Sequence, residues 1–148
     1  MTWAEKEVPN LELCRRLKEL GFPQDGEGWY WRKFDGFKDS KYELVLIEKW
    51  EKDKVILAYD IIKAPTCREL NEWLLKAKGS YNIYKWDDYE LEYCKDEWQT
   101  IQGIGGTFEK LIPSTKQSIE ADTLPNTYAK MLIWLVENGY VKFEEVKE

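Results

Sequence analysis

The fold of this chain depends on one stretch near its end, residues 122–140, which reads DTLPNTYAKMLIWLVENGY. The stretch predicts a helix with both of its ends specified. Thr123 or Asp122 can accept hydrogen bonds from the first free backbone N–H groups, and Pro125 fits a first turn, where no intrahelical donor is needed. Gly139 can adopt the left-handed conformation that commonly ends a helix. We therefore expect a helix of about four turns.

The residues between these two ends are apolar around most of the helix. A helix of this kind must be covered on most of its sides, so we expect it at the centre of the core. Beyond the helix, Tyr140 should fold back onto Leu135. The apolar face and its flanks comprise Leu124, Tyr128, Met131, Leu132, Ile133, Trp134, Leu135 and Val136.

The length and the composition predict a single domain over residues 1–148. Hydrophobic residues make up 43% of the chain, which is typical of neither a disordered nor a membrane-embedded protein. Aromatic residues reach 15%, more than a core of this size needs, so some rings should lie at the surface or line a groove. Two interpretations stay open: half-exposed strands that carry aromatic residues, or a binding surface rich in Tyr and Trp.

Charge and cysteine usage narrow the classes of function. The formal net charge is −6 and no basic cluster stands out, which argues against generic nucleic-acid binding. With no histidine and three scattered cysteines, we expect free thiols, no metal, no cofactor and no histidine-dependent catalysis. Cys67, at a predicted helix start, is the thiol that could be activated. No signal peptide or transmembrane run is evident, which predicts a cytoplasmic protein.

Two further helices are predicted from their end signals. The first begins at Asn10, a good N-cap, and ends at Gly21. The second begins with the capping box Thr66–Glu69 and is closed by Gly79. Each has one apolar face, so each should pack on one side only.

Strands are predicted where β-branched and aromatic residues cluster. The clearest are residues 42–47 and 55–62, which a turn at 51–54 should make antiparallel neighbours. Both are apolar on two faces, so we expect central strands that the helix at the end of the chain covers. These elements predict an α+β fold, with a mainly antiparallel sheet of about five or six strands packed with three helices. Weaker strand signals occur at residues 29–34, 81–86, 89–93, 98–102 and 140–143.

The glycine-rich segment Gly103–Gly106 precedes a predicted helical turn at residues 107–112 and a polar loop at 113–120. Glycines before a helix can bind phosphate. Neither the Rossmann spacing nor the Walker lysine-hydroxyl pair is present. A hinge or tight packing is therefore the favoured interpretation, and an anion site is the alternative.

Several carboxylates are candidates for chemistry. Asp60 interrupts the most hydrophobic strand, where it either accepts a hydrogen bond near solvent or is a buried, perturbed acid. Asp88, Glu90 and Glu92 share one face of a predicted strand. A solvated strand face is the favoured interpretation, and a divalent-cation site is the alternative. A hydrolase that uses some of these four acids is a further hypothesis.

Three segments together resemble small phage and prophage proteins of uncharacterised function. The segments are LCRRLKELGFPQ at residues 13–24, APTCRELNEWL at 64–74 and EADTLPNTYAKMLIWLVENGYV at 120–141. They cover about a third of the chain and bracket nearly all of it. The resemblance implies a phage origin and a host-cell location, and it brings no catalytic or ligand-binding residues with it.

Two main functional hypotheses follow. The first is a non-enzymatic phage or prophage accessory protein that binds a host or phage protein. It rests on the resemblance, the acidic charge, the aromatic excess and the lack of a catalytic motif. The alternative is a small-ligand or nucleotide-binding protein with an aromatic-lined cleft. Its candidate binding residues are Trp29, Trp31, Tyr81, Tyr84 and Asp60.

Overall fold

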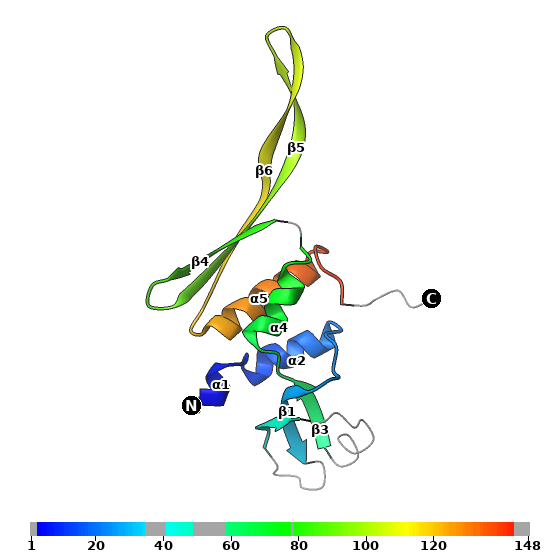
Figure 1. Ribbon diagram of the computed structural model, residues 1–148, viewed down its shortest axis with the longest axis vertical. Helices are drawn as coiled ribbons and strands as arrows, with labels where there is room; N and C mark the ends of the chain where they lie inside the picture. Colours follow the sequence, from blue (N-terminus) through cyan, green and yellow to red (C-terminus); the bar gives the residue numbers. More distant parts are fainter. Residues whose placement is uncertain (1–2, 35–40, 49–58, 78, 144–148) are drawn as a thin grey trace, which may run out of the picture.

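A computed structural model describes residues 3–34, 41–48, 59–77 and 79–143 of the chain (Figure 1). The helices lie between a small antiparallel sheet and a second sheet that extends into a long hairpin (Figure 1). This arrangement confirms the α+β class. The elements are α1 (Trp3–Lys6), α2 (Leu11–Glu19), β1 (Gly28–Phe34), β2 (Glu43–Ile47), β3 (Tyr59–Lys63), α4 (Cys67–Leu74), β4 (Ser80–Lys85), β5 (Tyr89–Gly103), β6 (Gly106–Ala121) and α5 (Leu124–Glu137).

The three helices predicted from end signals are confirmed as α2, α4 and α5, but α4 ends at Leu74, and the prediction that Gly79 closes it was wrong. The Asn10 side chain accepts a hydrogen bond from the backbone N–H of Leu13 and so caps α2. Thr66 and Glu69 form the predicted capping box of α4. Thr123 caps α5 by accepting a hydrogen bond from the third helical N–H. These local contacts satisfy donors that would otherwise be free in the first turn.

The end of α5 also follows the prediction. Gly139 has a φ of 81°, and the Tyr140 N–H donates to the Leu135 carbonyl at 2.8 Å. The Gly139 N–H donates to the Val136 carbonyl at 3.2 Å. This pair of bonds is the Schellman motif, which needs a left-handed residue after the helix. The helix α2 ends in the same way at Gly21, with a φ of 104°.

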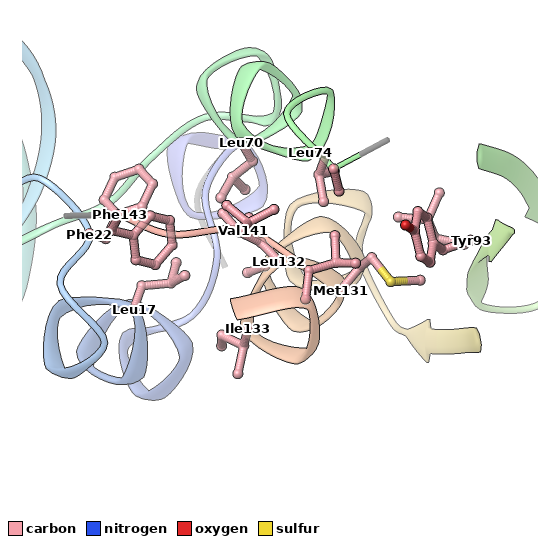
Figure 2. Close-up of a cluster of buried hydrophobic side chains, with 14 residues drawn as sticks. Leu17, Phe22, Leu70, Leu74, Tyr93, Met131, Leu132, Ile133, Val141 and Phe143 are labelled. Carbon is pink, nitrogen blue, oxygen red and sulfur yellow. The ribbon is translucent and has the colours of Figure 1, made fainter. Parts of the chain in front are cut away.

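The helix α5 is central to the core, as predicted, but its neighbours differ from the prediction. It packs against α4, α2 and the bases of β5 and β6. Figure 2 shows side chains of α2, α4 and α5 converging, with Phe22 and Phe143 at one end of the cluster and Tyr93 at the other. The prediction that α5 covers residues 42–47 and 55–62 was wrong for their described parts, 42–47 and 59–62, whose apolar side chains belong to a separate cluster. Val8, with Leu11 and Cys14 of α2, packs against the first sheet instead.

The first sheet has the strand order β2-β1-β3. The prediction that β2 and β3 are adjacent central strands was wrong, because β1 lies between them. In β1, Trp31 pairs with Leu44 of β2 on one side and with Ile62 of β3 on the other. Since β2 and β3 each run antiparallel to β1, they are parallel to each other, an arrangement that a short hairpin turn cannot connect. The predicted turn at residues 51–54 lies outside the described residues.

The second sheet has the order β4-β5-β6 and contains the largest departure from the prediction. The predicted helical turn at 107–112 and the loop at 113–120 were wrong, since both segments belong to β6. Gly105 has a φ of 91° and Gly106 a φ of 136°, so the glycine-rich segment is the tip of a hairpin. No helix begins there, and the anion-site alternative loses its basis.

The strands that the structure describes thus belong to two separate sheets, where the prediction had one. Residues 140–143, predicted as an edge strand, are irregular. Val141 and Phe143 are nevertheless buried in the core cluster beside α5. Their apolar character, which had suggested a strand, is explained by that packing.

Candidate functional site

The four aromatic residues predicted to line a cleft lie in different sheets. Trp29 and Trp31 belong to β1, whereas Tyr81 and Tyr84 belong to β4. The helices lie between these two strands (Figure 1). The structure therefore does not bring the four rings together around one cavity.

The partners of these aromatic side chains are mostly structural. Trp29 and Trp31 are half-buried and pack against a small apolar cluster that contains Val8 and Cys14. The Tyr81 hydroxyl donates to a helix carbonyl of α4 at 2.6 Å. Tyr84, in contrast, is exposed on the outer strand of the second sheet. Of the four residues, Tyr84 is the one whose ring is displayed to solvent.

Asp60 lies at a half-exposed junction of β3, α2 and the start of β2. Its carboxylate accepts a hydrogen bond from the Tyr42 hydroxyl. The Lys18 ammonium lies 3.9 Å from the same carboxylate. Burial raises the pKa of Tyr42, and the hydrogen bond to Asp60 raises it further, so the phenol stays protonated and donates. These contacts favour the structural interpretation of Asp60, that of a hydrogen-bond acceptor near solvent.

The second sheet carries a row of carboxylates on the face turned away from the helices. Glu90 and Glu92 lie on β5, opposite in direction to the buried Leu91, as the alternation predicted. The register places Glu120 of β6 directly beside Glu90. We call Glu90, Glu92 and Glu120 the acidic face.

The acidic face has its own electrostatic character. The pKa of Glu90 is raised by partial loss of hydration and then by the neighbouring carboxylate of Glu120, with a smaller repulsion from Glu92. Like charges paired across strands are unfavourable unless something compensates them. Lys116 compensates in part, with its ammonium 3.6 Å from Glu92. Within the described ranges, no group of three or more acidic, cysteine or histidine residues is arranged to hold a metal ion.

The hairpin formed by β5 and β6 projects well beyond the helices (Figure 1). The two strands pair antiparallel along their whole length, up to the pair Gly103 and Gly106 at the tip. The register shifts once, between Lys95 and Asp96. The described hairpin side chains that join the core cluster are all near its base, namely Leu91, Tyr93 and Ile119. We call the projecting part, residues 95–115, the arm. At its tip, Ile104 is fully exposed.

A cavity of about 440 Å³ lies where the starts of α4 and α5 meet. The Cys67 thiol in this cavity is half-buried. Its burial, and to a smaller extent the nearby charge of Glu7, raise the pKa of the thiol to about 11. The thiolate is therefore suppressed at neutral pH, which argues against an activated cysteine. Cys14, Cys67 and Cys94 form no disulfide with one another. The lining residues are Lys6, Glu7, Cys67, Tyr89, Asp122, Thr123, Leu124 and Pro125.

Sequence reasoning missed both the arm and this cavity. The alternation of residues on both sides of Gly103–Gly106 was the available signal for the arm. The cavity had no local signal, because its lining comes from four segments that are distant in sequence.

Comparisons with known proteins add no relative. No family model, no curated protein and no solved structure matches the chain. The resemblance to phage proteins therefore stays a prediction. In the part of the chain that the structure describes, no helix is long and apolar enough to cross a membrane.

Proposed function

We propose that this protein is a non-enzymatic accessory protein that binds another protein through its second sheet, with the arm as the main contact. The observation that carries the proposal is the projection of the arm beyond the helical core (Figure 1). A two-stranded hairpin is at best marginally stable in water when nothing packs against it. A bound partner would supply the missing layer.

The exposed residues of the second sheet support the same proposal. Ile104 at the arm tip and Trp86, in the turn between β4 and β5 at the other end of β5, are exposed, the latter to 72%. Exposed aromatic and aliphatic side chains of this kind are common in the centres of protein interfaces. The proposal extends to a phage or prophage origin, a host or phage protein as the partner, and action in the host cytoplasm, on the strength of the sequence resemblance.

Deleting the arm should abolish partner binding and leave the fold intact. In the variant, residues 96–114 are replaced by an Asn-Gly turn that joins Lys95 to Thr115, a pair already in register. No described side chain of the core cluster is removed, so the unfolding free energy should stay within about 1 kcal/mol of the parent value. The measurement is affinity capture from a host lysate, followed by mass spectrometry.

A matched control replaces Leu75, an exposed residue just after α4 and outside the second sheet, by lysine. Proteins that both the parent chain and this variant recover, and that the arm-deleted chain loses, would support the proposal. Equal recovery by the arm-deleted chain, or no recovery above background by any of the three, would contradict it.

A second candidate function is small-ligand binding, and the cavity at the starts of α4 and α5 favours it. Its volume of about 440 Å³ lies in the range of ligand pockets. We expect a ligand at 100 times its dissociation constant to stabilise the fold by about 2.7 kcal/mol, which raises the melting temperature by roughly 5–10 °C. Thermal-shift screening of nucleotides and sugars measures this effect.

The variant Leu124→Trp, which fills the cavity, should remove the shift, whereas Leu75→Trp on the exposed side of α4 should retain it. A ligand that stabilises the parent and both variants equally does not bind in the cavity.

A further inference from the structure

The outer edge of β4 is open, and the residues around it are suited to a strand partner. Among the described residues, β4 pairs only with β5. Five of its six residues are exposed. Natural edge strands are usually protected by proline, bulges or several charges. The edge here reads SYNIYK, with no proline and a single charge at its end.

The two faces beside this edge differ in chemistry. The register places Asn82 next to Glu92 and Tyr84 next to Glu90, so these β4 residues share the acidic face. On the other face, Ile83 pairs with Leu91 and is 50% exposed. A strand added along β4 would therefore meet carboxylates on one face and apolar side chains on the other.

Resting on the proposed function, we infer that the β4 edge binds an extended segment of the partner protein as a fourth strand, and that this segment alternates basic and apolar residues. Successive strand residues point to opposite faces, so alternate lysines or arginines would all project over the acidic face. The added strand would lie about 10 Å from β5, within the combined reach of a long basic side chain and a glutamate. Backbone hydrogen bonds would supply affinity, and the alternation would supply specificity.

The charge distribution favours this occupant over a second copy of the chain. Glu90 and Glu120 repel each other in the free protein, and nearby cations would relieve that repulsion. A second copy brings a net charge of −6 and a second acidic face. A basic partner brings the opposite sign, which also speeds association at low salt.

The test uses the full chain and a labelled peptide, Arg-Val-Lys-Ile-Arg-Val-Lys, with binding measured by fluorescence anisotropy at low and high salt. A scrambled peptide of the same composition, without the alternation, is the control for charge alone. Ile83→Lys places a charge on the edge and should raise the dissociation constant at least about tenfold. Leu75→Lys, on an exposed α4 residue, should leave it unchanged.

The acidic face is tested separately with the double variant Glu90→Gln and Glu92→Gln, which changes its two residues on β5. This change should raise the dissociation constant about three- to tenfold and weaken its salt dependence. Hydrogen exchange should show that the alternating peptide protects backbone amides within residues 80–85, because a paired strand occupies them.

Equal binding of the scrambled peptide, or of the alternating peptide to the Ile83→Lys chain, would overturn the inference. So would a dimer in sedimentation that Ile83→Lys dissociates, since a second copy would then occupy the edge. Arm-dependent capture of a partner without any peptide binding would leave the proposed function standing and overturn only the inference about the β4 edge.

Discussion

Replacing Leu135 by alanine should lower the free energy of unfolding by about 2–5 kcal/mol. The Leu135 side chain on α5 is completely buried. It belongs to the cluster that joins α5 to α2 and α4 (Figure 2). Truncation removes the transfer free energy of the lost methyl groups and leaves a cavity among helices that cannot fully collapse. Urea denaturation followed by circular dichroism measures the change.

The exposed Leu75 provides a matched control for this prediction. Leu75 is 68% exposed on α4, so Leu75→Ala should change the stability by no more than about 0.5 kcal/mol. If Leu135→Ala is as stable as Leu75→Ala, then α5 does not hold the core together. A Leu135→Ala chain that keeps its stability and loses a partner would instead make α5 a binding helix.

The helices could be predicted because their signals are local. Asn10, Thr66 and Thr123 each cap a helix by accepting from the backbone N–H three residues further along the chain. Gly139 ends α5 for an equally local reason, its left-handed conformation. Every residue that specifies these ends is close in sequence to the group that it satisfies, so no tertiary information was needed.

The strand order could not be predicted because strand pairing is not local. The strongly apolar segments at residues 42–47 and 55–62 were predicted to be neighbours, yet β2 and β3, which fall within them, each pair with β1. Because β1 is the middle strand, its Tyr30 side chain is completely buried. Its mixed sequence, GWYWRKF, does not distinguish a central strand from an edge strand. Burial of the strand's two faces is decided by elements elsewhere in the chain.

The candidate site was predictable only within single strands. Alternation placed Glu90 and Glu92 on one solvent-facing side of β5, and the structure agrees. Glu120 completes the acidic face through its pairing with Glu90, but it had been assigned to a loop. The prediction that Trp31 and Tyr84 line one cleft depended on tertiary structure. Composition alone does not indicate to which sheet an aromatic side chain belongs.

Replacing Tyr93 by alanine should have the second large effect, a loss of about 3–5 kcal/mol in the free energy of unfolding. Tyr93 lies on β5 and is completely buried. Its ring centroid is 5.2 Å from that of Tyr81, 6.0 Å from that of Tyr140 and 6.4 Å from that of Trp134. The residue therefore connects the second sheet to α5 and to the segment that follows it.

The packing around Tyr93 makes relaxation after its loss difficult. A Cβ atom added to Gly79 would lie 2.6 Å from the Tyr93 ring, so the chain before β4 is in close contact with it. Truncation would remove the surface on which Gly79, Tyr81 and Trp134 converge, and the side chains left behind would lose their contacts. The base of the arm should then be held less firmly than the helices, whose own contacts through Leu135 are unchanged.

Two measurements separate this effect from a general loss of stability. Tyr93→Phe keeps the ring and should cost less than about 1.5 kcal/mol, whereas Tyr84→Ala, on the exposed face of β4, should stay within about 0.5 kcal/mol of the parent. In hydrogen exchange under native conditions, Tyr93→Ala should lose protection in β4 and β5 before α5 does. Equal loss of protection in all three elements would show that the second sheet and the helices unfold as one unit. Partner binding by Tyr93→Ala should weaken at temperatures where α5 is still protected, since a partner can contact the β4 edge and the arm together only if the second sheet keeps its structure.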